Sequence, residues 1–433
     1  MQKTDQWKDQ LSFYRFWQND KVSESGLMDI ATTHCQSQCD ELSHGLLIED
    51  TTEVRLENHR RRITDTTGLG WLRNKQLGFY CHPTLLVNAS DHSLVGSIDI
   101  HLWHRDENQQ SKEERKYKQQ VLKDKESYRW SSCAIESKKK LASVKRLTVV
   151  QDREGDIYES FHLLKENGLD FVIRHSQNRK IVSSDPLKSK DYINTLSPIA
   201  EYELEIKGNN KKRKARMAVM EIRFGEVSIC RPSNLKSGEY PDSIPLYLVQ
   251  VKEKPQSVPS TEQAIEWTLY TSHPVTTHIQ ALEIVGYYQA RWIIEDLFRT
   301  IKKEGVNYEA SELETGPALR KLFIMSLMAA IQILQLRQAR SGDTSQKSSL
   351  VFSKEQIECM QGLLPRFEGK TERLKNPFDQ DNLAWATWII ARLGGWKGYS
   401  SQRPPGVITL HDGWVRFQTL FEGWNIAKDM YKH

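Results

Sequence analysis

Cysteine is scarce in this sequence, and the few cysteines do not form a metal-binding pattern. Six occur among 433 residues, at positions 35, 39, 81, 133, 230 and 359. Three residues separate Cys35 from Cys39, whereas the ligands of a zinc knuckle usually have two residues between them. We therefore expect reduced thiols in the protein core rather than a zinc site.

Long apolar segments are also absent. No apolar stretch at the N-terminus resembles a signal peptide, so Asn88-Ala-Ser is expected to be an idle glycosylation match. The longest apolar segment, 322–336, contains serine and glutamine and is shorter than the ~20 residues that cross a bilayer. It predicts a buried helix, no membrane partner and a cytoplasmic protein.

Charge of one sign is not in large excess, because the net charge is only +5. The charge is unevenly distributed, however. Residues 112–146 contain 12 basic and 5 acidic side chains, whereas residues 1–45 contain 4 basic and 7 acidic ones. A nucleic-acid surface is therefore expected in the body of the chain rather than at its start. The length and 38% hydrophobic content predict two or three substructures with a sizeable core.

One stretch carries an informative mixture of side chains, and its spacing predicts a helix from Leu282 to Lys303. At about 100° per residue, one side of this helix is apolar and should pack against a core. The other side carries cations, aromatics and one carboxylate: Tyr288, Arg291, Trp292, Glu295, Arg299 and Lys302. Such a side is typical either of a solvated, salt-bridged face or of a surface that binds a polyanion.

Two acidic residues further upstream occupy matching positions. Gly45-Leu-Leu-Ile-Glu-Asp and Leu147-Thr-Val-Val-Gln-Asp are apolar runs of strand length that end in Asp50 and Asp152. Either aspartate alone is more often a helix cap or a turn acid. Together with Glu295 they provide the three carboxylates of a two-metal phosphoryl-transfer site, because oxygen ligands suit Mg²⁺.

The spacing of Tyr288, Arg291, Glu295 and Lys302 resembles the Tyr-Arg-Glu-Lys signature of the insertion-sequence-four family of DDE transposases. Similar stretches span nearly the whole chain, at 47–52, 152–157, 171–174, 267–272 and 390–395. The resemblance implies an α/β, ribonuclease-H-like catalytic core with an inserted β-rich subdomain and a C-terminal helical region. The implied divisions are an N-terminal helical segment (1–44), two core parts (45–175 and 263–316), the insert (176–262) and the helical region (317–433).

The resemblance also implies a function. Asp50, Asp152 and Glu295 would hold two Mg²⁺ ions, for which Mn²⁺ is a plausible substitute, and would nick a transposon end. Hairpin formation, hairpin resolution and strand transfer to target DNA would follow. The partners would be DNA and a second copy of the chain, paired through the C-terminal helices, at the nucleoid of a bacterial cytoplasm.

The family pattern assigns further residues to DNA. Tyr288, Arg291 and Lys302 would contact phosphates, with Arg299, Trp292 and Arg174 as helpers. Trp267 matches a tryptophan that receives a flipped base, although a strand tryptophan in the core is the alternative interpretation. The charge run at 211–214 favours nucleic-acid contact through Lys212 and Arg213 over a solvated turn.

Local patterns predict the other elements. They indicate two short helices with an aromatic cluster in 1–45, a hairpin of 79–87 with 94–102, and a helix within 112–140. Asp156 is expected to cap a helix ending near Glu166, and 170–175 to be a strand. Strands are expected at 202–206, 217–224, 227–230 and 246–251. Further helices are expected at 317–340 and after Thr409, which would be the N-cap of the last helix.

Two alternatives to a transposase fit the same residues. One is another nuclease or resolvase with a ribonuclease-H-like fold. The other is a truncated, non-catalytic inhibitor that forms mixed dimers, because the family usually carries an end-binding segment before the stretch that matches Tyr14-Arg15-Phe16. Retention of all three acids does not separate an inhibitor from an enzyme.

This alternative leads to a first prediction, on DNA preference. The acidic balance of residues 1–45 offers no cationic surface, so we expect weak binding with little preference for a transposon end over other sequences. Competitive gel-shift titration of the cognate end against a scrambled duplex, at one salt concentration, measures the ratio. A preference of roughly several hundredfold, which approaches the ~10³-fold lower end for specific DNA-binding proteins, would place end recognition in the residues present.

Overall fold

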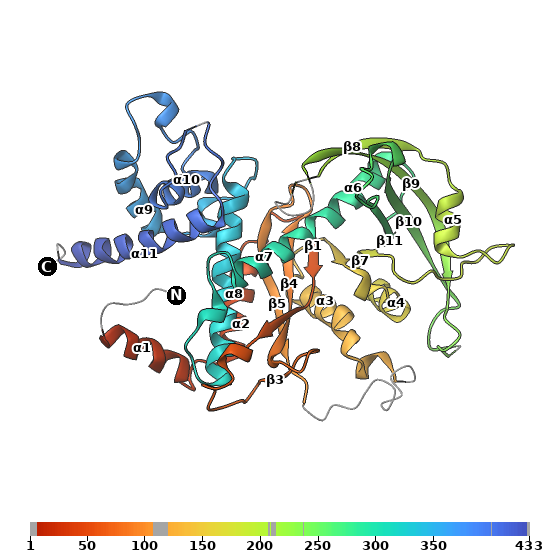
Figure 1. The fold of residues 1–433 in the computed structure, drawn as a ribbon, viewed down its shortest axis with the longest axis horizontal. Coiled ribbons are helices and arrows are strands. Elements are labelled where there is room, and N and C mark those ends of the chain that lie inside the picture. The colour runs from red at the N-terminus through yellow and green to blue at the C-terminus, as the bar shows by residue number, and fades with distance from the viewer. Residues whose placement is uncertain are drawn as a thin grey trace. The chain divides into compact units, whose positions relative to one another are not determined.

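The computed structural model describes residues 7–106, 120–206, 208, 214–236, 238–399 and 401–430. They form two compact units, which we describe one at a time. The first unit takes its described residues from Met1–Leu42, Thr51–Gln109 and Trp292–His433, and the second from Ser43–Asp50 and Gln110–Arg291. Each contains helices packed on strands (Figure 1), so the chain is a mixed α/β protein.

The second unit is built on a sheet with the strand order β1-β6-β7-β11-β10-β9-β8. Its parallel part consists of β1 (His44–Glu49), β6 (Arg146–Gln151) and β7 (Asp170–Arg174). Its antiparallel part consists of β11 (Glu266–Thr271), β10 (Ser243–Glu253), β9 (Arg216–Cys230) and β8 (Ala200–Ile206). The parallel strands are buried along their length, which explains why their sequences are continuous apolar runs.

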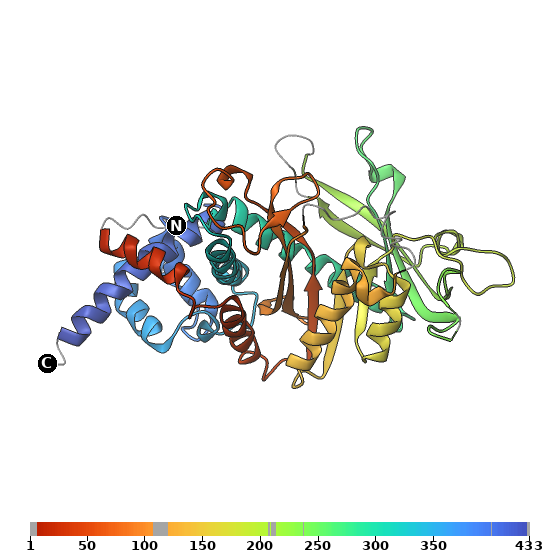
Figure 2. The ribbon, with the colours of Figure 1, turned by 90° about the horizontal axis from the view of Figure 1, so that it is seen from below.

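Helices cover this sheet. α3 (Arg129–Lys140) and α4 (Tyr158–Glu166) lie side by side (Figure 2), and a buried hydrogen bond of 2.7 Å joins Ser131 to Ser160. α5 (Ser189–Thr195) packs on β9 and β10, and α6 (His278–Ala290) packs on β6, β7 and β10. α6 begins with a capping box of Thr277 and Gln280. The parallel strands are therefore in contact with α3 and α4 as well as with α6.

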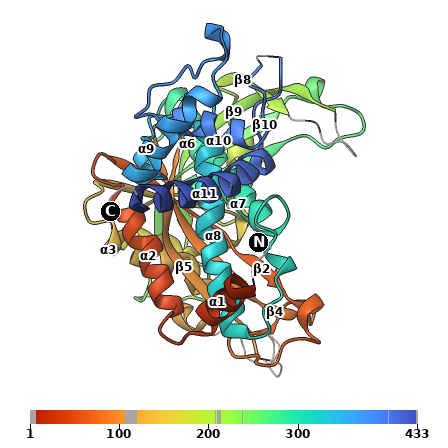
Figure 3. The ribbon, with the colours of Figure 1, turned by 90° about the vertical axis from the view of Figure 1, so that its left-hand side faces the viewer.

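The first unit surrounds one long helix, α8 (Gly316–Ala339). Figure 3 shows α8 beside α2. The other helices are α1 (Trp7–Gln18), α2 (Glu24–Gln36), α7 (Trp292–Lys302), α9 (Lys354–Leu363), α10 (Leu383–Leu393) and α11 (Val407–Met430). The strands are β2 (Thr52–Arg55), β3 (Gly70–Trp71), β4 (Leu77–Asn88) and β5 (Leu94–Trp103), of which β4 pairs antiparallel with the other three. α10 and α11 approach closely at Gly413, where an added Cβ would lie 1.9 Å from the Ile390 carbonyl oxygen.

α8 is long and apolar enough to cross a membrane, with a mean hydropathy of 1.5 in its most apolar window. However, 78% of that window is buried inside the chain, as in the core helix of a globular protein. Gln335 of this helix donates to the Val95 carbonyl at 2.9 Å, so a polar side chain is used to fix α8 against β5. The predicted buried helix is confirmed.

Several predicted elements are confirmed. The two N-terminal helices are present, and Phe13 and Phe16 make ring contacts with Trp17. The hairpin of β4 and β5 is present, as are β7 and α8 near their expected bounds. All six cysteines have free thiols.

Other predictions about elements need correction. The helix expected from Leu282 to Lys303 is two helices, because α6 ends at Ala290 and Arg291 adopts a turn before α7 begins. The strands expected at 217–224 and 227–230 form one strand, β9, which stays paired with β10 through Gly225. α11 begins at Val407, so Thr409 lies inside the helix and is not its cap. Of the helix expected within 112–140, residues 112–119 lie outside the described residues, and the described remainder forms two short 3-10 helices (Leu122–Asp124 and Glu126–Tyr128) followed by α3.

Asp156 does not cap α4. The N-cap residue of this helix is Ile157, whose side chain makes no capping hydrogen bond. The Asp156 carboxylate is buried and ion-paired with Arg179 at 2.6 Å. It also accepts hydrogen bonds from the backbone N–H groups of Ser176 and Gln177, at 2.7 and 2.6 Å. A charged partner and two amide donors stabilise the carboxylate more than one helix end would, so Asp156 fixes the chain after β7 instead.

Candidate active site at the ends of two parallel strands

Asp50 and Asp152 directly follow β1 and β6, which are parallel neighbours in the second unit. The strand register pairs Ile48 with Val150, so each aspartate comes two residues after its paired residue. Both carboxylates therefore stand at the same edge of the sheet, where the carboxyl ends of parallel strands commonly form ligand sites.

A buried hydrogen bond fixes these two strand ends. Gln151 Nε2 donates to Glu49 Oε2 at 2.6 Å, one residue before the two aspartates. The same amide group donates to the Trp130 carbonyl of α3, and neither Glu49 nor Gln151 is accessible to solvent. Because the pair locks the strand register from the other face of the sheet, it also fixes the level at which Asp50 and Asp152 emerge.

Arg291 is a cation in contact with this pair of carboxylates. Its Nη1 donates to Asp50 Oδ2 at 2.8 Å, and the two side chains are only 9% and 21% exposed. Burial raises the pKa of Asp152 above its usual value, while the charges of Arg291 and Arg174 act in the opposite direction. The site therefore contains one ion-paired carboxylate and one that is partly desolvated, an arrangement found more often at functional sites than elsewhere.

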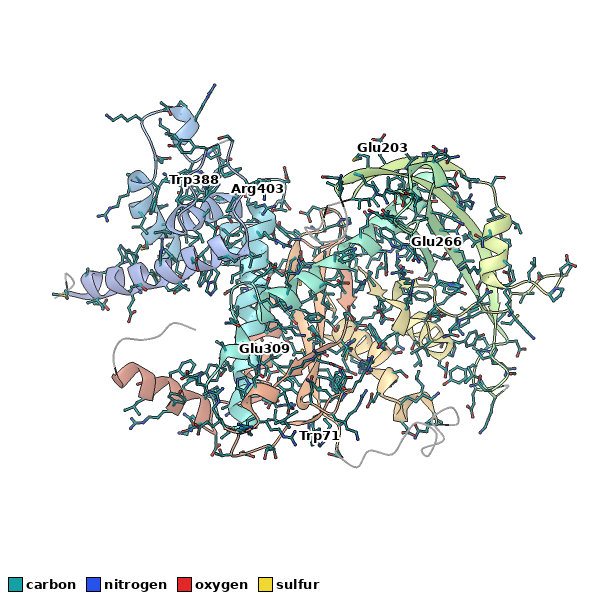
Figure 4. All side chains as sticks on the ribbon, in the orientation of Figure 1. Trp71, Glu203, Glu266, Glu309, Trp388 and Arg403 are labelled. Atoms are coloured by element: carbon teal, nitrogen blue, oxygen red, sulfur yellow. The ribbon has the colours of Figure 1, made fainter. Side chains whose placement is uncertain are left out.

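The aromatic residues of the site lie on β11 and α6. The rings of Trp267 and Tyr288 have centroids 6.0 Å apart with a tilt of 59°. Trp267 is half-buried. Tyr288 is 3% exposed, and its hydroxyl has no hydrogen-bond partner among the described residues. Arg174 Nη2 donates to the carbonyl of Glu266, which Figure 4 labels.

The remaining candidates lie on α7 in the first unit and are described within that unit. Its apolar side is confirmed, because four residues of that side are buried: Ile293, Ile294, Leu297 and Ile301. Trp292 is 53% exposed. Arg299 is ion-paired with Asp296 at 3.0 Å, and Glu295 is half-buried. Lys302 Nζ donates to Thr52 Oγ1 at 2.6 Å, and burial lowers the pKa of this amine.

The expected polyanion-binding side is therefore only partly exposed. Trp292 and Arg299 face solvent, whereas Tyr288 and Arg291 are buried. Arg291 donates a hydrogen bond to Asp50, and Lys302 donates one to Thr52.

The donor set suits a hard divalent cation. Asp50 and Asp152 offer carboxylate oxygens, which Mg²⁺ and Mn²⁺ prefer, at one edge of one sheet. A cation at Asp50 would compete with Arg291 for the carboxylate. No cluster of three or more His, Cys, Asp or Glu side chains able to hold a metal occurs among the residues that the structure describes.

Sequence analysis overlooked a basic segment at residues 60–62. Arg60, Arg61 and Arg62 are exposed after β2, and the Arg60 guanidinium lies 5.2 Å from the ring centroid of Trp71, labelled in Figure 4. Three consecutive arginines are themselves the signal that could have identified this surface. Lys212 and Arg213, predicted to bind DNA, lie outside the described residues.

A comparison with protein families gives a match to part of the chain. A family model described as a transposase DDE domain matches residues 96–331, which is more than half of the 433 residues. The matched range includes Asp152 and Glu295, whereas Asp50 precedes it.

Proposed function

Because this chain belongs to the transposase DDE domain family, we propose that it is a cut-and-paste DNA transposase similar to the insertion-sequence-four enzymes. Membership of the family supports a transposase with DNA as its substrate. The proposal adds the residues that carry the reaction, its metal requirement and the order of its steps.

One observation supports the proposal most directly. Asp50 and Asp152 stand at matching positions after two parallel strands, and Arg291 forms an ion pair with Asp50. Two acids and a guanidinium at one sheet edge suit a phosphodiester, because the guanidinium can pair with a phosphate oxygen while the acids hold cations. We propose Glu295, from the Tyr-Arg-Glu-Lys motif, as the third carboxylate.

The proposed reaction consists of phosphoryl transfers. Water attacks the phosphorus at the transposon end, the bond to the 3′ oxygen breaks, and a free 3′-hydroxyl remains. This hydroxyl then attacks the opposite strand, which forms a hairpin and releases the flanking DNA. Hydrolysis of the hairpin regenerates the 3′-hydroxyl, which attacks the target strand.

In each transfer, the protein positions the reacting DNA groups and neutralises the negative charge of the phosphate. When bound, divalent cations would activate the attacking oxygen and stabilise the leaving one. Asp50, Asp152 and Glu295 would hold them, and Arg291 would exchange its contact with Asp50 for one with the DNA phosphate. We assign the second phosphate contact to Lys302, with Arg174 and Arg299 as helpers.

We expect Arg291→Ala and Lys302→Ala to weaken DNA binding and to flatten its dependence on salt. Each phosphate contact that is lost should reduce the slope of log K against log salt by about 0.9 for duplex DNA. Fluorescence anisotropy at several salt concentrations measures the slope. Lys303→Ala is the matched control, because Lys303 is exposed and follows Lys302 directly. A slope equal to that of wild type in either variant would remove that residue from the phosphate contacts.

A nicking assay with the chain alone tests the proposed function. End-labelled transposon DNA and Mg²⁺ should give a nick and then a hairpin, and chelation of the metal should stop both. A folded chain that binds DNA but never nicks it would favour the non-catalytic inhibitor. Equal cleavage of unrelated duplexes would favour a general nuclease of the same fold. A dimer through the C-terminal helices remains part of the proposal, and exposed Leu420 and Ile426 on α11 are compatible with it.

A further inference from the structure

A cavity of about 740 Å³ lies at the C-terminal end of α8, within the first unit. Its walls come from three parts of the chain, namely Arg340 and Ser341, then Thr371, Arg373 and Leu374, and then Trp396, Gly398, Tyr399, Ser401, Gln402, Pro404 and Pro405. None of the described residues that line it is acidic, although Arg340 and Arg373 both line it. The cavity is therefore a local concentration of positive charge.

Arg340 is the better-defined cation of this cavity. It is half-buried, and its Nη1 donates to the Pro405 carbonyl at 2.8 Å. No carboxylate pairs with it among the described residues, whereas its neighbour Arg337 pairs with Asp296. Burial and the charge of Arg337 both lower the pKa of Arg340. A partly desolvated cation beside another cation is unfavourable, and a bound anion would relieve that cost.

An aromatic wall completes the cavity. Tyr399 is 55% exposed, which is unusual for a large aromatic ring, and Trp396 lies three residues before it. The Trp396 indole donates to the carbonyl of Arg403, labelled in Figure 4, at 3.2 Å. The loop is held in shape by a hydrogen bond of 2.9 Å from the Lys397 N–H to Gln402 Oε1. Gly398 adopts a φ of 76°, which a side chain would disfavour.

We propose that this cavity binds one unpaired nucleotide of a DNA strand, with its phosphate at Arg340 and Arg373 and its base against Tyr399. Arginine binds phosphate bidentately, and an exposed aromatic ring accepts any base by stacking. An unpaired nucleotide is required, because a base inside the duplex does not offer its face. The proposal rests on the proposed function in that DNA is taken as the substrate.

The position of Arg340, taken by itself, also has an explanation that involves no ligand. A cation at the C-terminal end of a helix interacts favourably with the helix dipole, and Arg340 occupies that position on α8. That explanation does not extend to Arg373, which lies in a separate segment, or to the exposed ring of Tyr399. The experiment therefore relies on those two side chains, whose exposure makes their substitution safe for folding.

The experiment compares two labelled DNA duplexes of one sequence, one blunt and one with a short single-stranded tail. Anisotropy titration at fixed salt gives both affinities for each variant. Tyr399→Ala should weaken binding of the tailed duplex by about tenfold, the effect of one lost stacking contact, and leave the blunt duplex unchanged. Tyr399→Phe should bind both like wild type. Arg373→Gln should reduce the salt slope on the tailed duplex by about 0.7.

Arg366→Gln is the matched control, because Arg366 is exposed on the same unit and does not line the cavity. Equal losses on tailed and blunt duplexes in Tyr399→Ala would overturn the proposal. Binding of a free nucleoside monophosphate that depends on Tyr399, with no effect on tailed DNA, would also overturn it. Nicking of a blunt substrate at saturating DNA should be unaffected in all four variants. Failure of the wild type to nick would instead count against the proposed function, independently of the tail measurement.

Discussion

Asp50→Asn, Asp152→Asn and Glu295→Gln should each lower metal-dependent nicking by about a thousandfold or more. The magnitude follows because a metal ion in such a site supplies several kcal/mol of transition-state stabilisation, and about 1.4 kcal/mol is a factor of ten in rate. The substitutions keep the size of each side chain and remove its charge. A single-turnover nicking assay with Mg²⁺, repeated with Mn²⁺, measures the loss.

The same variants should differ in stability, because Asp50 and Asp152 have different surroundings. Asp50→Asn removes the carboxylate charge that pairs with the buried guanidinium of Arg291, so the melting temperature of this variant in metal-free buffer should fall. Asp152→Asn removes a charge that burial disfavours, and the hydrogen bond from the Glu154 N–H to Asp152 Oδ1 is retained by the amide oxygen. Its melting temperature should equal or exceed that of wild type.

Asp296→Asn provides the matched control for Glu295→Gln. Asp296 is the next residue on α7, and its carboxylate is ion-paired with Arg299 and Arg337 rather than assigned to catalysis. It should keep wild-type nicking even if its melting temperature falls. A folded Asp50, Asp152 or Glu295 variant that cleaves as fast as wild type would remove that residue from the proposed triad.

The fold was most predictable where periodicity and chemistry agreed. Apolar runs predicted β1 and β6, and turn residues between two such runs predicted the β4–β5 hairpin. Prediction failed where tertiary contacts override local preference. Gly225 predicted a break in β9, yet pairing with Leu248 of β10 carries the strand through it. Asp156 fitted a helix cap, yet Arg179 offers its carboxylate a stronger partner.

The site was less predictable than the fold. The sequence suggests that both aspartates end strands, but not that β1 and β6 are neighbours in a register that brings the aspartates level. The helical spacing places Arg291 on an exposed side, whereas a turn at this residue lets its side chain reach Asp50 and become buried. The helical spacing places Tyr288 on the same exposed side, whereas the structure buries it against the sheet of its own unit. Such contacts depend on long-range packing, which spacing along one helix does not encode.

The position of Trp267 allows the two early steps of the proposed reaction to be separated. Its ring is half-buried at β11 and lies beside that of Tyr288, so one part of its surface remains open to a partner. Hydrolysis of the first strand needs no base outside the stack, whereas closing a hairpin requires the DNA to bend sharply, and a flipped base relieves the crowding. Stacking on a tryptophan would stabilise that base by about 1–3 kcal/mol.

Trp267→Ala should therefore leave the first nick at its wild-type rate and slow hairpin formation by about ten- to a hundredfold, the rate equivalent of one lost stacking contact. Denaturing gels of a labelled transposon end resolve the nicked and hairpin products in one time course. Trp267→Phe is the matched control, because it keeps an aromatic face and should restore most of the hairpin rate. A pre-nicked substrate isolates the second step from the first. Loss of both steps together in Trp267→Ala, with a lower melting temperature, would instead identify Trp267 as a residue that only supports the fold of β11.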